Sequence, residues 1–211
     1  MNTLGKIRFY MFMLLLIVAG ACMMVFGIKT KSSLAKDPID LNDPDVEWSD
    51  LKVGDHVEMD VPILMDCFAR YEKDGTDTQR YYCLPRYEED ELSITDFIGL
   101  DVNDKSLFSQ YDSLVDDTWE WWQSADTSLP SGTDVHINGV IRELPNDQKE
   151  FFEEYLKDDL ELSDDLVDDS CYGLYITPES AKGNTGIIIL GAVFLIAGLG
   201  ITGFSLTRRR G

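Results

Sequence analysis

Four cysteines and two histidines are the side chains in this sequence whose chemistry could include nucleophilic attack, redox exchange or metal binding. Two of the cysteines, Cys67 and Cys83, flank a predicted hairpin turn at residues 73–77 with Gly75 at its centre. Residues whose numbers add up to 150 then face each other across the hairpin, and these two cysteines form such a pair. We therefore expect a disulfide between Cys67 and Cys83, with two free thiols packed as small apolar groups as the alternative.

The other candidates for chemistry are Cys171, His56 and His136. The two histidines are 80 residues apart and each begins a predicted strand, so a metal pair requires the fold to bring them together. The sequence contains no G-x-S-x-G motif, no glycine-rich phosphate loop and no H-E-x-x-H motif. We predict that the chain is not an enzyme and has no cofactor. The alternative is a thiol- or metal-dependent enzyme that uses the histidines or Cys67, Cys83 and Cys171.

A cluster of tryptophans marks a candidate partner surface in a helix predicted to begin near Asp104. A helix turns by about 100° per residue, so Trp119 and Trp122 lie on its apolar stripe and Trp121 lies about 160° from Trp119. We expect Trp119 and Trp122 in the core and Trp121 exposed, where tryptophan is enriched at interfaces. The alternative is that residues 42–48 cover Trp121.

The middle of the chain is strongly acidic. All 39 acidic residues lie between Asp37 and Glu179, whereas 13 of the 18 basic residues lie between Lys29 and Lys182, which gives this part a net charge of 13 − 39 = −26. Because nucleic-acid binding depends mainly on Lys and Arg contacts to phosphate, this charge argues against a nucleic-acid partner. Its simplest interpretation is a soluble, solvated surface.

Two uncharged runs predict two membrane spans, at residues 9–28 and 187–206. Each run has 20 residues and at ~1.5 Å per residue reaches about 30 Å, the thickness of the hydrocarbon core of a bilayer. The first run is too long for a cleaved signal peptide, so we expect an uncleaved signal anchor. The segment Ala19–Cys22 resembles a bacterial lipoprotein cleavage site only weakly, because apolar residues follow Cys22.

Small residues recur every seven positions in both predicted spans and would form a strip on one face of each helix. Such strips let two helix backbones approach closely. The alternative is that glycine is simply common in membrane helices. The strip residues are Gly20 and Gly27 in the first span and Gly191, Gly198 and Ser205 in the second.

Basic residues at the ends of the spans predict the topology. The terminal tails, residues 1–8 and 207–211, contain Lys6, Arg8, Arg208, Arg209 and Arg210. Four lysines flank the spans on the other side, but the three arginines directly follow the second span, and long domains cross the membrane largely regardless of charge. We therefore expect a two-pass protein of the cell membrane with both termini in the cytoplasm and the central domain outside.

We expect the central domain at residues 48–180, joined to the spans by an arm at residues 29–47 and a short linker at residues 181–186. Alternating apolar residues and turn signals predict three strands, a helix, a strand, a second helix from Asn146 and a last strand. This order is that of an α+β, OB-like fold, a mostly antiparallel five-stranded barrel or curled sheet with two helices. The expected strands cover residues 57–71 with a bend near Pro62, 78–87, 97–102, 133–144 and 171–177.

Four segments between the spans also resemble a family of uncharacterised bacterial proteins with two transmembrane helices, classed as a domain of unknown function. The segments are YYCLP (Tyr81–Pro85), FIGLDV (Phe97–Val102), LVDDTW (Leu114–Trp119) and VHINGVI (Val135–Ile141). The resemblance implies an OB-like extracytoplasmic domain on a membrane anchor, and it supplies no catalytic residue. We predict a binding or structural module whose partners are the lipid bilayer and another membrane or envelope protein. Its ligand and its oligomeric state stay open.

Overall fold

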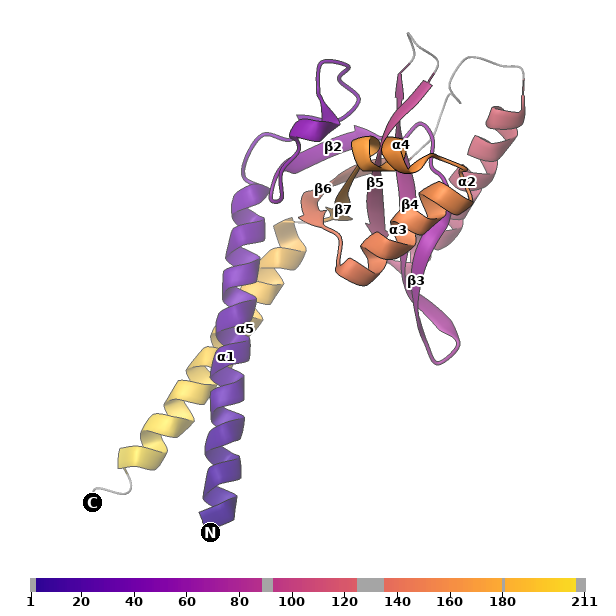
Figure 1. Ribbon diagram of the computed structural model, residues 1–211. Coiled ribbons are helices and arrows are strands. Elements are labelled where there is room, and N and C mark those ends of the chain that lie inside the picture. The colour runs from indigo at the N-terminus through magenta and orange to yellow at the C-terminus, as the bar shows by residue number, and fades with distance from the viewer. Residues whose placement is uncertain (1–2, 89–92, 125–134, 180, 208–211) are drawn as a thin grey trace. The chain divides into compact units, whose positions relative to one another are not determined.

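The computed structural model describes residues 3–88, 93–124, 135–179 and 181–207. It divides the chain into two compact units, a helical unit of residues 1–36 and 179–211 and a sheet unit of residues 37–178 (Figure 1). The helical unit consists of α1 (Thr3–Ser33) and α5 (Ala181–Thr207). Residues 181–186, predicted as a linker, are therefore the first turns of α5.

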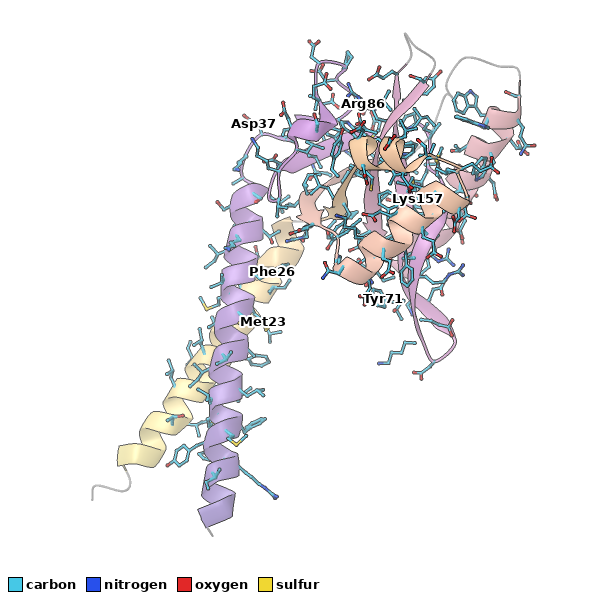
Figure 2. The ribbon with its side chains drawn as sticks, viewed as in Figure 1. Met23, Phe26, Asp37, Tyr71, Arg86 and Lys157 are labelled. Atoms are coloured by element: carbon cyan, nitrogen blue, oxygen red, sulfur yellow. The ribbon has the colours of Figure 1, made fainter. Side chains whose placement is uncertain are left out.

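Both helices are long and apolar enough to cross a membrane, over Ile7–Ser33 and Thr185–Thr202. Their outward side chains are large and apolar, as Figure 2 shows for Phe26 on α1. Water would solvate such a surface poorly, whereas lipid tails would cover it. The side chains that are at least half exposed include Met11, Leu14, Leu15, Val193, Ile196 and Leu199.

The predicted glycine strips lie where α1 and α5 pack together. A Cβ atom added to Gly20 would come within 2.7 Å of the backbone oxygen of Gly191, and one added to Gly191 would come within 2.8 Å of the backbone oxygen of Gly20. A Cβ atom added to Gly198 would come within 2.6 Å of the Ile17 side chain. Gly27 is buried on the same face as Gly20. The side chain of Ser205 and the whole of Arg208, Arg209 and Arg210 lie outside the described residues.

The sheet unit is α+β, and its seven strands form one mixed sheet in the order β1-β2-β6-β7-β5-β4-β3. The pairs β1–β2 and β5–β7 are parallel, and the other four pairs are antiparallel. The strands are β1 (Ile39–Asp40), β2 (His56–Asp60), β3 (Cys67–Lys73), β4 (Thr76–Glu88), β5 (Ser93–Val102), β6 (His136–Glu143) and β7 (Cys171–Pro178). The predicted five-stranded, OB-like barrel is thus corrected to a seven-stranded mixed sheet.

The largest difference lies in the predicted first strand, residues 57–71. It forms two strands, β2 and β3, which stand near opposite ends of the strand order. The connecting residues 61–66 pass through the interior, because Val61, Ile63 and Leu64 are fully buried and Met65 is 4% exposed. Three consecutive buried residues cannot belong to a strand with one solvated face, so residues 61–66 do not continue β2 as a half-exposed strand.

Helices cover both faces of this sheet. On one face, α2 (Phe108–Gln123) packs its buried stripe against core residues that include Tyr82, Ile98 and Ile141. On the other face, α3 (Asn146–Asp158) and α4 (Asp164–Ser170) pack against a second core. Both faces of the central strands are therefore buried. As predicted, the turn before α2 is capped by Asp104, whose carboxylate accepts from the backbone of Ser106 at 3.0 Å.

The chain from Asp37 to the short 3₁₀ helix η1 (Trp48–Asp50) belongs to the sheet unit, although residues 29–47 were predicted as a loose arm. Trp48 is fully buried in the core beneath α2. Arg86, labelled in Figure 2, holds this segment to β4 and β5. Its guanidinium lies 3.2 Å from Glu47 and 3.3 Å from Asp96, and it donates to the Pro44 carbonyl. This ion-pair network turns the arm into an integral part of the domain.

Candidate functional site

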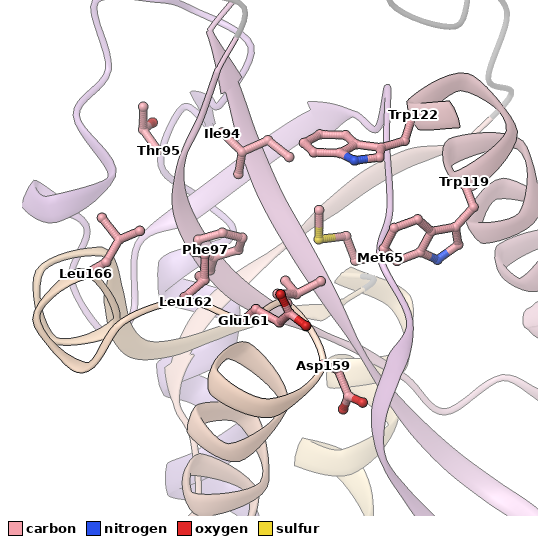
Figure 3. Close-up of a pocket in the computed structure, with 11 residues that line it drawn as sticks. Met65, Ile94, Thr95, Phe97, Trp119, Trp122, Asp159, Glu161, Leu162 and Leu166 are labelled. Carbon is pink, nitrogen blue, oxygen red and sulfur yellow. The ribbon is translucent and has the colours of Figure 1, made fainter. Parts of the chain in front are cut away.

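A cleft of about 370 Å³ opens between α2, the start of β5 and the turn that joins α3 to α4 (Figure 3). Its volume lies within the usual range for a ligand pocket, about 300–1,000 Å³. Its walls are mostly apolar. The lining residues are Met65, Ile94, Thr95, Phe97, Trp119, Trp122, Asp159, Leu160, Glu161, Leu162 and Leu166.

The last two turns of α2 place two tryptophans along one side of the cleft. Trp119 is half-buried against the core, and Trp122 follows one turn later with 52% of its surface exposed. The prediction that Trp122 is a core residue was wrong, because the buried stripe of α2 ends at Thr118. Trp121, predicted as the exposed partner surface, is instead half-buried, and its ring packs edge-on against Tyr87 at 5.4 Å between centroids. The exposed tryptophan of this helix is therefore Trp122.

A carboxylate holds the indole of Trp119 in place. Trp119 Nε1 donates to Asp66 Oδ2 at 3.2 Å, and the hydroxyl of Tyr155 donates to the same oxygen at 3.3 Å. The hydroxyl of Tyr155 also accepts from the backbone nitrogen of Asp66 at 3.3 Å. Burial raises the pKa of Tyr155, and the nearby thiol of Cys83 and the carboxylate of Asp66 add to that rise. Asp66 thus ties the buried connector to both α2 and α3.

Two carboxylates stand at the margin of the cleft opposite the tryptophans. Asp159 is the C-cap residue of α3, and Glu161 follows in the turn with a left-handed backbone, φ 55°. Figure 3 shows the carboxylates of Glu161 and Asp159 on the side of the cleft formed by the turn between α3 and α4. The described lining residues include no Lys, Arg or His. The cleft therefore combines an aromatic wall with a negative edge.

The structure does not bring Cys67 and Cys83 together. A bulge between Cys67 and Ala69 shifts the end of the hairpin, so Cys67 lies opposite Tyr82 rather than Cys83. Cys67 faces the core beneath α2, whereas Cys83 belongs to the core beneath α3. All four cysteines, including Cys22 and Cys171, are free thiols in this structure. The predicted register is confirmed from Ala69 to Tyr71, where opposed residues add up to 150, but it is wrong at Cys67, which therefore lacks the geometry for a direct cross-strand disulfide with Cys83.

The thiols and imidazoles are also poorly placed for chemistry. Burial raises the pKa of Cys67, Cys83 and Cys171, which disfavours the reactive thiolate. His136 lies 2.7 Å from Asp60, its partner at one end of the β2–β6 ladder. His56 stands at the other end of that ladder, and its ring lies 3.0 Å from the Asn138 side chain. Among the described residues, no group of three or more His, Cys, Asp or Glu side chains could hold a metal ion.

The sequence signalled only part of this site. Helical spacing placed Trp119 on the apolar stripe of α2, but the other side of the cleft comes from residues 159–166, for which no helix or strand was predicted. α4 begins there, and the hydroxyl of Ser163 accepts from the backbone nitrogen of Leu166 at 3.4 Å. A serine followed by two aspartates is a helix-start signal that could have revealed α4.

Comparison with known proteins gives a family and no function. No curated protein and no solved structure matches the chain. One family model matches residues 3–206, which is nearly the whole sequence and covers both helices and the sheet unit. The chain therefore belongs to the family described as a domain of unknown function, DUF8577.

Proposed function

We propose that this chain is a membrane-anchored binding module of the bacterial cell envelope. Its two apolar helices anchor it as a hairpin, with both termini in the cytoplasm and the sheet unit outside. The exposed apolar surface of α1 and α5 and the arginines after the second span support this arrangement. The proposed partner is another membrane or envelope protein, which a domain anchored outside the cytoplasm would meet, and the net charge of −26 between Lys29 and Lys182 disfavours nucleic acid.

The observation that carries the proposal is the cleft beside Trp122. A large aromatic side chain that is 52% exposed at the rim of an apolar cavity is costly to leave in water and is typical of a binding hot spot. The cavity is built from elements that the core holds rigidly, since Met65 and Phe97 in its floor are each 4% exposed. A preformed cleft loses little conformational entropy on binding.

An enzymatic function on the thiols or histidines has less support. Such an enzyme needs a thiolate or a metal-binding imidazole next to a substrate pocket. Cys67, Cys83 and Cys171 are absent from the lining of the cleft, and the two histidines are also absent from it. A non-catalytic binding role is therefore the function that the geometry supports best.

Photocrosslinking in native membranes tests this proposal. p-Benzoylphenylalanine replaces Trp122 in the full chain, and a matched variant carries it at Phe151, an aromatic residue on α3 that is 49% exposed and does not line the cleft. We expect a discrete crosslinked product from position 122 that is absent from position 151. The proposal fails if position 122 gives no product, or if both positions give the same set of products.

A further inference from the structure

We infer that the group recognised by the cleft is a basic side chain flanked by apolar residues on the partner protein. This inference rests on the proposed binding function and names the chemistry of the ligand. It follows from the combination of an aromatic wall, an apolar floor and a negative margin in one cavity.

The aromatic wall suits a cation. The faces of aromatic rings carry partial negative charge, and a cation within about 6 Å of a ring centroid is attracted to them, most strongly by tryptophan. Two of the four tryptophans in the chain, Trp119 and Trp122, line this cleft. The hydrogen bond from Trp119 to Asp66 fixes the orientation of one indole. It also lets the Asp66 carboxylate increase the electron density of that ring.

The apolar floor suits the stem of a long basic side chain. Lys and Arg carry three or four methylene groups that pack on apolar surface while the charged head stays near polar groups. In the cleft, Met65, Leu160 and Leu162 offer that surface, and Asp159 and Glu161 stand at the margin where the head would end. Apolar neighbours of the basic residue would pack on Ile94 and Leu166 at the rim.

Charge selects the cation over other ligands. Asp159 and Glu161 are both acidic, and the described lining residues include no base that could neutralise them. An anionic ligand would meet these carboxylates and the net charge of −26 carried by residues 29–182. A neutral apolar ligand would gain nothing from the two exposed carboxylates.

Peptide binding to the full chain in a nonionic detergent tests the inference by calorimetry. The probe is acetyl-Ala-Leu-Lys-Leu-Ala-amide, and its matched analogue has norleucine in place of lysine, which keeps the stem and removes the ammonium group. We expect the lysine peptide to bind roughly 3- to 30-fold more tightly than the norleucine peptide, the range expected for a cation–π contact. A third peptide with glutamate in place of lysine should show no binding.

Variants assign the binding to the cleft. Trp122→Leu and Glu161→Gln should each weaken the lysine peptide, and Glu161→Gln should leave the affinity of the norleucine peptide unchanged. The matched controls are Phe151→Leu, which removes an exposed ring outside the cleft, and Glu72→Gln, which removes one exposed charge on β3. Neither control should alter the affinity. Thermal unfolding of each variant shows whether it is folded.

The outcomes separate this inference from the proposed function. If the norleucine peptide binds as tightly as the lysine peptide, the cleft binds apolar segments and the inference is wrong, while the proposed function stands. If benzyltrimethylammonium binds and no peptide does, the ligand is a small organic cation and the inference is again wrong. If nothing binds and position 122 gives no crosslink in membranes, both fail.

Discussion

Replacing Arg86 with methionine should lower the free energy of unfolding of the sheet unit far more than a comparable replacement at its surface. The side chains of Arg86 and Asp96 are 10% and 12% exposed, and their charged atoms lie 3.3 Å apart. Methionine fills similar volume but leaves the Asp96 carboxylate buried without its cation. Removing one partner of a buried ion pair costs about 3–5 kcal/mol. Because the Tyr172 hydroxyl still donates to Asp96, we expect the lower end, about 3 kcal/mol.

Urea unfolding of the full chain at constant detergent concentration measures this cost, with the fluorescence of buried Trp48 among the signals. Arg70→Met is the matched control, because the Arg70 side chain is 63% exposed and lies 3.9 Å from Asp77. An exposed pair of this kind contributes no more than about 1 kcal/mol. The double variant with Asp96→Asn should lose less than the sum of the two single losses. If Arg86→Met costs no more than Arg70→Met, Arg86 does not clamp the arm.

The remaining predictions concern the helices, the thiols and the response to high pH. Gly20→Leu should weaken the pairing of α1 with α5, because a Cβ atom at this position meets the backbone of α5. Gly200→Leu should leave the pairing unchanged, because a Cβ atom at Gly200 has no neighbour within 4 Å. Crosslinking between the two helices measures the difference. Alkylation without reductant should modify Cys67 slowly at neutral pH and faster as the pH rises, because burial raises the pKa of its thiol, and Cys83 should react only after unfolding; intact mass reports both. Burial raises the folded-state pKa of Tyr155, so the stability that it contributes is present below pH about 10 and is lost as the pH rises further. Tyr155→Phe should make this loss of stability smaller. Urea unfolding at several pH values above and below 10 measures the difference.

Local signals in the sequence predicted the elements better than their pairing. The Asp74–Gly75 turn forms as expected, with positive φ at both residues, and the helix predicted to begin near Asp104 forms with a buried stripe that includes Phe108, Tyr111 and Leu114. Each of these features depends on residues within a few positions of one another. Local chemistry therefore carried enough information to predict them.

The parts that sequence reasoning missed depend on distant contacts. The turn at residues 73–77 predicted the pairing of β3 with β4, but nothing local to residues 57–71 shows that their first part pairs with β6 instead. The bulges between Cys67 and Ala69 and between Tyr71 and Glu72 likewise cannot be read from alternation, yet they decide which face Cys67 occupies. The cleft was hidden for the same reason, because its two sides come from residues 94–122 and 159–166.

The central claim, an outward-facing domain whose cleft is occupied in the membrane, is tested most directly by cysteine labelling. Single variants Val53→Cys and Leu166→Cys place thiols at exposed positions away from the cleft and on its rim, respectively. An impermeant maleimide is added to intact cells and to purified protein, and peptide mass spectrometry separates the new thiols from the native ones. The account predicts rapid labelling of Val53→Cys in both samples. It predicts labelling of Leu166→Cys that is several-fold slower in cells than after purification. Equal rates for Leu166→Cys in both samples, or no labelling of Val53→Cys in intact cells, would contradict it.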